Sequence, residues 1–322
     1  ALLWPDTDPV AIEEIRQALQ EARDCHITLK NYHKDGTSFW NELLISPVRD
    51  ENGTLTHFIG IQTDITRLRR AEEERHEMEI AKQIQLSLLP RAPLKLDGAL
   101  LAGCCLPATE VGGGYCDYCC RQKAGDIVIA DVSGHSVGAA LVMAETRSTL
   151  KAEALWKPKA ESAAAPGAGE VLRALNVLLY EDLNRADLFI TMFYMKYHID
   201  TRQLFYASAG HNRPLLLCDG EDICRDLDVD GLILGVKKEV QFEEKSLFLK
   251  KGDVVLLYTD GIPEAENKAG EFFGIPRLKE LFVAHRDTSP QDIIDVVIKA
   301  LREFCQSPTF RDDISMVVLK IT

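Results

Sequence analysis

The sequence has no long apolar run and no excess of positive charge. No stretch approaches the roughly 20 apolar residues that a membrane-spanning helix needs, and residues 1–5 lack the basic region and apolar core of a signal peptide. Lys and Arg number 37 against 50 Asp and Glu, and the net charge is −13. A nucleic-acid-binding surface needs clustered positive charge. We therefore expect a cytoplasmic protein without membrane or nucleic-acid partners.

Histidine is absent from the one cluster of cysteines. The chain has nine Cys, an odd number, which favours a reducing compartment over a disulfide framework. Five of them gather in Cys104-Cys105 and Cys116-x-x-Cys119-Cys120. Because this segment is strand-like and holds no His, we interpret these residues as small side chains of a core, with zinc ligation as the alternative.

Residues 1–66 are the first of three segments in a chain of 322 residues, which is long enough for two domains. Asp8-Pro9 begins a helix that the apolar spacing continues to residue 22. Strand-like runs follow, separated by the turns Lys34-Asp35-Gly36 and Asp50-Glu51-Asn52-Gly53. The expected strands are residues 26–32, 39–47 and 57–63. One helix and three antiparallel strands make half of a small α+β domain.

Residues 67–90 are the second segment, a polar linker. The run from 68 to 89 has no Gly or Pro and is dense in Glu, Arg and Lys, and Pro90 closes it. Its apolar positions fit a heptad only in part, since Arg75 and Lys82 interrupt the repeat. We expect a helix that forms a coiled-coil dimer, with a single solvated helix as the alternative.

Residues 91–322 alternate short strands with helices, which predicts an α+β sandwich. A loop of small residues at 161–169 separates the first two helices. The expected strands are 126–130, 188–197, 203–207, 213–217, 253–258 and 314–320, and the expected helices are 137–150, 168–183 and 290–305.

Aspartates stand where the buried strands of this segment meet loops. Asp131 ends the apolar strand at 127–130, Asp260 follows the strand at 254–258, and Asp312-Asp313 precede the last strand. Converging carboxylates would repel one another and are costly to bury unless they are paired. Mg²⁺ or Mn²⁺ would resolve that repulsion, because hard ions prefer carboxylate oxygens. The alternative is that each Asp only forms a turn, and spacing alone leaves both open.

Six ordered motifs in residues 80–322 resemble those of the metal-dependent (PPM-type) serine/threonine phosphatases, in their bacterial stress-response and sporulation branch. The motifs are Ala81-x-x-Ile84-Gln85-x-x-Leu88-Leu89-Pro90, Val111-Gly112-Gly113-Gly114-Tyr115-Cys116-Asp117, Ala130-Asp131-Val132-Ser133-Gly134-His135, Ala209-Gly210-His211-Asn212, Tyr258-Thr259-Asp260-Gly261 and Asp312-Asp313-Ile314-Ser315.

The resemblance implies the PPM phosphatase fold, a β-sandwich flanked by helices with the metal site at one end. It implies that Asp131, Asp260 and Asp312, together with the carbonyl of Val132, hold two Mn²⁺ or Mg²⁺ ions. The implied reaction is attack of metal-activated water on phosphoserine or phosphothreonine, and the implied substrate is a STAS-domain antagonist in a sigma-factor pathway. His211 is expected in a structural hydrogen bond near the site.

The first of these motifs to carry a carboxylate departs from the family pattern. The family has Asp where this chain has Gly114, and the later Asp117 is retained. We interpret Asp117 as a partial substitute for the lost ligand. The alternative is a non-catalytic pseudophosphatase or scaffold that binds the partner.

Residues 1–66 resemble the C-terminal half of a PAS domain of the LOV photoreceptor type. The matching runs include Asn31-Tyr32-x-Lys34-Asp35-Gly36, Phe39-Trp40-Asn41 and Gly60-Ile61-Gln62-x-Asp64. The resemblance implies flavin contacts from Asn31, Asn41 and Gln62, and ordinary turn or edge polarity is the alternative. The photochemical cysteine is expected before residue 1, so we expect FMN in the parent protein and not in this chain. Dimerisation is expected through the linker and this segment.

Overall fold

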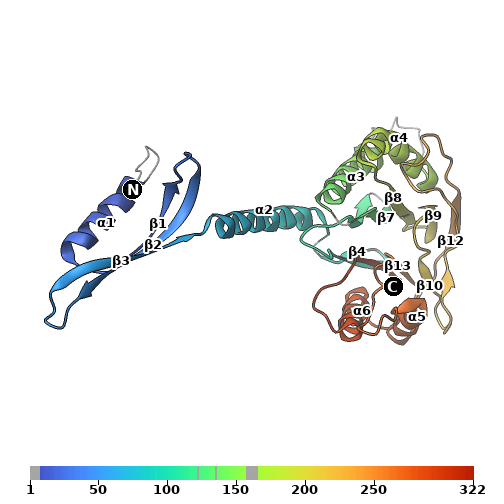
Figure 1. Cartoon of the computed structure of the whole chain (residues 1–322). Coiled ribbons are helices and arrows are strands. Elements are labelled where there is room, and N and C mark those ends of the chain that lie inside the picture. The colour runs from blue at the N-terminus through green and yellow to red at the C-terminus, as the bar shows by residue number, and fades with distance from the viewer. Residues whose placement is uncertain (1–7, 91, 122, 135, 157–165) are drawn as a thin grey trace. The chain divides into compact units, whose positions relative to one another are not determined.

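The computed structural model describes residues 8–90, 92–121, 123–134, 136–156 and 166–322. The chain divides into two compact units, Ala1–Ile80 and Ala81–Thr322, which are treated separately (Figure 1). The first seven positions, His135 of the third phosphatase motif, and residues 161–165 of the small-residue loop lie outside the described residues.

The first unit is a helix packed on a three-stranded antiparallel sheet. Its elements are α1 (Pro9–Glu21), β1 (Cys25–Tyr32), β2 (Ser38–Arg49) and β3 (Leu55–Asp64), with the strands in the order β1-β2-β3. Asp8 caps the helix by accepting a 2.9 Å hydrogen bond from the amide of Val10, and Pro9 occupies the first turn. Ala18 packs on Cys25 and Ile45 in a small core. The helix and all three strands match the sequence prediction.

Helix α2 (Thr66–Leu88) follows β3, close to the predicted bounds. The boundary between the two units falls inside it, after Ile80. Gln85 is its one buried residue, as expected for a sequence that lacks a continuous apolar stripe. Among the described residues, no helix of the chain is both long and apolar enough to cross a membrane.

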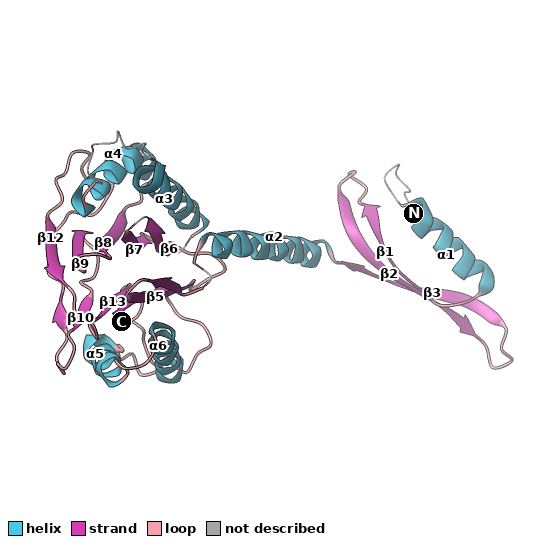
Figure 2. Cartoon of the chain, turned by 180° about the vertical axis from the view of Figure 1, so that it is seen from behind, coloured by secondary structure: helices cyan, strands magenta, loops and turns pink. Residues whose placement is uncertain are grey.

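The second unit is a sandwich of two antiparallel sheets covered by helices on both outer faces (Figures 1 and 2). The six-stranded sheet has the order β11-β10-β13-β14-β5-β4, and the five-stranded sheet β12-β9-β8-β7-β6. The strands are β4 (Leu94–Leu96), β5 (Ala99–Leu106), β6 (Gly114–Arg121), β7 (Ala124–Val132), β8 (Ile190–His198), β9 (Gln203–Ala209), β10 (Leu215–Leu217), β11 (Arg225–Asp226), β12 (Glu244–Phe248), β13 (Val254–Tyr258) and β14 (Ile314–Ile321). The helices are α3 (Val137–Trp156), α4 (Ala168–Ala186), α5 (Gly274–Ala284) and α6 (Pro290–Cys305).

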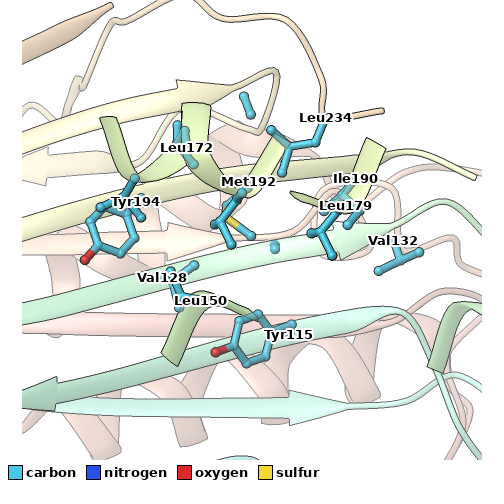
Figure 3. Packing of buried hydrophobic residues seen from close by; sticks show 14 of the residues in the cluster. Tyr115, Val128, Val132, Leu150, Leu172, Leu179, Ile190, Met192, Tyr194 and Leu234 are labelled. Carbon is cyan, nitrogen blue, oxygen red and sulfur yellow. The ribbon is translucent and has the colours of Figure 1, made fainter. Parts of the chain in front are cut away.

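Side chains that alternate along a strand pack into two different hydrophobic layers, one on each face of the sheet. In β7, Ile127 and Ile129 enter the layer between the sheets, whereas Val128, Ala130 and Val132 pack under α3 and α4. Figure 3 shows the second of these layers, in which Val128 lies near its register partner Tyr194 and Val132 lies near Ile190. Strands buried on both faces read as continuous apolar runs, and each fully buried aliphatic side chain contributes about 1.5–3 kcal/mol.

Several elements escaped the sequence prediction. Helix α5 begins at Gly274, which has a positive φ, and buries Leu278 and Phe282, but its apolar pattern is too short to predict a helix. Strand β12 is an edge strand with exposed alternate positions. β4 and β11 were also not predicted, and β5 and β6 were anticipated only as the strand-like sequence around the clustered cysteines. The α+β sandwich itself is as expected.

Candidate functional site

The alternation of side chains places Asp131 in the gap between the two sheets. Asp131 shares its face of β7 with Ile127 and Ile129, which belong to the inter-sheet core. In register beside it lie Gly114 on β6 and Thr191 on β8. Directly opposed residues of antiparallel strands share a face. One end of the sandwich therefore presents positions 114, 131 and 191 to the same space.

Thr259 ties the loop carrying Asp260 to the start of β14. Its hydroxyl donates to the carbonyl of Asp313 at 3.0 Å and accepts from the amide of Ser315 at 2.9 Å. Its own amide donates to the carbonyl of Ser315 at 3.0 Å. Gly261 lies so close that a Cβ there would stand 2.4 Å from the carbonyl oxygen of Asp313, so no larger residue fits without a backbone shift. These contacts hold Asp260 against the Asp312-Asp313 pair.

The carboxylates of this region perturb one another. Burial, followed by the charges of Asp260, Asp312 and Asp313, raises the pKa of Asp131 to about 8. Burial and Asp312 also raise the pKa of Asp260 above its usual range. Repulsion of this kind requires the groups to be near neighbours. The structure therefore places Asp131, Asp260 and Asp312 near one another, which spacing alone left open and the resemblance to the phosphatase family implies.

These residues form a negative region with oxygen donors and not a closed ligand cage. Among the described residues, no three His, Cys, Asp or Glu side chains converge closely enough to hold a metal ion by themselves. The donor set still fits a hard divalent cation, since such an ion would neutralise the repulsion that raises both pKa values. Water and substrate oxygens complete such a sphere in open catalytic sites.

The carboxylate of Asp313 accepts hydrogen bonds from backbone amides, a role that the sequence did not reveal. Its side chain is 3% exposed. Oδ1 accepts from the amide of Ala108 and Oδ2 from the amide of Gly114, both at 2.8 Å. Asp313 therefore fastens both ends of the β5–β6 loop to the start of β14. Its neighbour Asp312, which is half-buried, is left to face the site.

Gly114 offers no side chain to the site, and its surroundings are tight. A Cβ at this position would lie 2.8 Å from Oγ of Ser315 and 3.1 Å from Cβ of Asp313. Oγ of Ser315 is buried and has no hydrogen-bond partner among the described residues. A carboxylate at position 114 therefore requires Ser315 to turn.

Asp117 lies on the opposite face of β6 and is not brought to the other aspartates. It is three residues beyond Gly114, an odd number, so its side chain leaves the sheet toward α3. There it lies 3.7 Å from Nε of Arg147 and 3.2 Å from Nζ of Lys151, and it accepts a 3.2 Å hydrogen bond from the hydroxyl of Tyr115. This ion-pair role does not support the interpretation of Asp117 as a substitute ligand.

Val132 and His211 complete the inventory of predicted residues. Val132 is buried, and its carbonyl packs against Gly113, where a Cβ would stand 2.4 Å from the oxygen. His211 follows Gly210, whose φ of 67° makes the turn after β9. Its Nδ1 lies 2.8 Å from the hydroxyl of Thr191, the register neighbour of Asp131. Burial lowers the pKa of His211 to about 4, so the ring is neutral and fits the structural role.

The three residues expected to contact a flavin share one face of the sheet in the first unit. In register, Asn41 lies opposite Leu29, Asn31 opposite Phe39 and Gln62 opposite Leu43. These positions share the face of the sheet that packs on α1. Asn41 is 1% exposed, and both atoms of its amide lack a partner among the described residues. A buried, unpaired amide fits a ligand with hydrogen-bonding groups at its edge.

Comparison with known proteins agrees with this geometry. Residues 123–322 match the family model of Stage II sporulation protein E (SpoIIE), and residues 1–67 match a PAS domain. The chain belongs to the SpoIIE family. The expected resemblance, a phosphatase domain of this type behind a PAS segment with LOV-like relatives, is confirmed.

Two curated relatives match more than two thirds of this SpoIIE-family chain. It is 29% identical over 249 residues to phosphoserine phosphatase RsbU of Bacillus subtilis, covering 77% of this chain and 71% of RsbU. It is 27% identical to protein IcfG of Synechocystis, covering 84% of this chain and 46% of IcfG. A blue-light photoreceptor of Listeria innocua is 40% identical over 93 residues, which are 28% of this chain and 34% of the photoreceptor.

Solved structures confirm the fold of the SpoIIE-family unit. The SiaA-PP2C domain of Pseudomonas aeruginosa superposes with a TM-score of 0.67 at 20% identity, covering 79% of this chain and 99% of that domain. The RsbU and RsbW domains of Rv1364c from Mycobacterium tuberculosis give a TM-score of 0.57 at 24% identity, covering 70% of this chain and 60% of that one. The second unit has the PP2C phosphatase fold.

Proposed function

We propose that the chain is a sensor-regulated, metal-dependent serine/threonine protein phosphatase. One observation carries the proposal: burial and the charges of Asp260 and Asp312 raise the pKa of Asp131 at one end of the sandwich. The likeness to RsbU, a phosphoserine phosphatase, supports the same activity here. Unneutralised carboxylates at a strand end cost stability, which fits a site kept for binding cations.

Asp131, Asp260 and Asp312, with the carbonyl of Val132, are the proposed ligands of Mn²⁺ or Mg²⁺. A bound ion of this kind lowers the pKa of its water and polarises phosphate oxygens. The chain's own residues fix the geometry around that chemistry. Thr259 and Asp313 hold the loops in place, and neutral His211 braces Thr191 beside Asp131.

The proposed substrate is a phosphoserine on a small cytoplasmic signalling protein of the STAS-domain antagonist type. The family membership and the RsbU likeness support a partner-switching role. Control is assigned to the PAS segment, whose relatives include a blue-light photoreceptor. Asn31, Asn41 and Gln62 are the proposed contacts of an FMN ring in the parent protein.

We place a homodimer contact on α2. Its residues Ile80 and Ile84 are one helical turn apart and are 45% and 60% exposed. Exposed apolar residues at this spacing fit a coiled-coil seam.

Gly114 favours a second candidate, a non-catalytic protein that binds the phosphorylated partner. The two candidates separate in one assay. Phosphate release from a phosphoserine protein and from an aryl phosphate is followed as Mn²⁺ is raised from zero, with Asp131→Asn as the control. Metal-dependent release above that control supports the phosphatase. Partner binding without release supports the scaffold.

A further inference from the structure

Two cysteines from opposite sheets meet inside the second unit. Cys105 is the last residue but one of β5 in the six-stranded sheet, and Cys116 lies in β6 in the five-stranded sheet. The thiol of Cys105 donates to the sulfur of Cys116 at 2.8 Å. A disulfide bond is about 2.05 Å long, so a shift of under about 1 Å joins the two atoms. The zinc alternative is not supported, because no metal-holding group of His, Cys, Asp and Glu occurs among the described residues.

The two thiols differ in their access to solvent. Cys116 is 1% exposed and belongs to the inter-sheet core, whereas Cys105 is half-buried at the edge of that core. The close contact with the Cys105 thiol, followed by burial, raises the pKa of Cys116 above its usual range. Cys105 is thus the sulfur that a small reagent reaches first, and Cys116 is the one held in place to react with it.

The pair underlies the β5–β6 loop. Cys105 precedes Ala108 by three residues, and Cys116 follows Gly114 by two; the amides of Ala108 and Gly114 are the two that Asp313 fastens. Cys105 also pairs in register with Ser315. A covalent link between Cys105 and Cys116 would close the loop that carries Val111 to Gly113, next to the two amides that Asp313 binds.

We propose that Cys105 and Cys116 are a modification site that forms a reversible disulfide on reaction with a hydroperoxide. The Cys105 thiolate attacks one peroxide oxygen, the O–O bond breaks, and a sulfenic acid and hydroxide result. The Cys116 sulfur then attacks the Cys105 sulfur, the S–O bond breaks, and the departing hydroxide takes the Cys116 proton. In sum, two thiols and one hydrogen peroxide give one disulfide and two waters. The sulfurs lose two electrons and the peroxide gains them.

The whole chain, reduced and then treated with one equivalent of hydrogen peroxide, tests this site by mass spectrometry. Glu110 lies between the two cysteines, so a glutamate-specific protease combined with trypsin separates the peptides that carry them. We expect one linked pair, Cys105 with Cys116, which a dithiol reductant reverses. Hydrogen exchange at the amides of 108 and 114 should slow, and Tm should rise by about 5 °C for so short a closed loop.

Matched variants make the assignment specific. Cys105→Ser leaves the core thiol in place and should abolish the link, the exchange protection and the Tm shift together. Cys120→Ala removes an exposed thiol of β6, the strand of Cys116. This variant should leave the link, the exchange protection and the Tm shift unchanged. A link through Cys104, Cys119 or Cys120, or a Cys105 that proceeds to sulfinic acid while Cys116 stays free, would overturn the proposal. None of these readouts depends on phosphatase activity.

Discussion

The backbone amide of Gly114 donates a 2.8 Å hydrogen bond to Oδ2 of Asp313. This contact joins the first strand of the site to the last, β6 to β14, and it occupies one oxygen of a carboxylate whose other oxygen accepts from Ala108. Both oxygens of Asp313 therefore bind backbone amides, and Asp312 remains as the carboxylate of that pair that can serve a cation. The same contact holds position 114 against Ser315, so any side chain at position 114 would meet the Ser315 hydroxyl.

Gly114→Asp should strengthen Mn²⁺ binding by at least about tenfold, because it adds one charged oxygen donor near Asp131 at short range. Isothermal titration measures the affinity. Gly114→Ala is the control, since it brings the same Cβ against Ser315 without a carboxylate and should bind no more tightly than wild type. Equal affinities for the Asp and Ala variants would show that position 114 does not face the cation.

The raised pKa of Asp131, about 8, sets a pH dependence. The folded value lies above the ordinary value of about 3.9, so the metal-free fold is favoured at low pH. Between about pH 4 and pH 8 Asp131 is ionised in the unfolded chain but still protonated in the fold, so stability falls over that range. Asp131→Asn removes this loss, so its Tm without metal should match wild type at pH 4 and exceed it at pH 8. Mn²⁺ should stabilise wild type more at pH 8 than at pH 5. A wild-type-minus-variant difference that stays flat with pH would contradict the assignment.

Gln85 clamps the loop that begins the site. Its Nε2 donates to the carbonyl of Gly112 at 2.6 Å, and its Oε1 accepts from the amide of Gly112 at 3.1 Å. Gln85→Ala should cost about 1–3 kcal/mol, since it leaves both buried backbone groups of Gly112 unpaired. Urea unfolding measures the loss. Ser87→Ala, which removes only a bond within its own helix turn, should change stability by less than about 0.5 kcal/mol; an equal loss in both variants would refute the clamp.

Negative charges introduced on α2 test the proposed dimer contact. Replacing Ile80 and Ile84 together by Glu should convert a dimer to a monomer in light scattering, because two carboxylates would have to be buried in the seam. Gln83→Glu on the same helix is the control. A wild-type chain that is already monomeric at micromolar concentration would exclude this contact.

Asn41→Val should stabilise the first unit by about 1–2 kcal/mol. The amide of Asn41 is buried without a partner, and an unsatisfied buried polar group costs about 1–3 kcal/mol, whereas Val suits the middle of a strand. Asn31→Ala is the comparison, since the Asn31 side chain accepts from the amide of Tyr32 and its loss should not stabilise. Calorimetry of the two variants decides. A destabilised Asn41→Val would mean that the amide has a structural role.

Local chemistry made much of this fold predictable. Ser289 and Asp292 form a capping box at the start of α6, Pro290 occupies its first turn, and this helix matches its predicted bounds. Asp117 shows what could have been predicted and was not. Positions 114 and 117 differ by an odd number, so strand alternation alone sends them to opposite faces. By contrast, the meeting of Asp131 with Asp312, and of Cys105 with Cys116, depends on how two sheets pack, which the order of residues in one chain does not specify.

Release of phosphate from a phosphoserine protein as Mn²⁺ is raised, compared between wild type and Asp131→Asn, tests the central claim most directly. We predict release that saturates with Mn²⁺ in wild type, falls by at least about 100-fold in the variant, and rises with pH toward 8. Release that is independent of Mn²⁺, or that Asp131→Asn leaves unchanged, would contradict a metal-dependent phosphatase built on this group of aspartates.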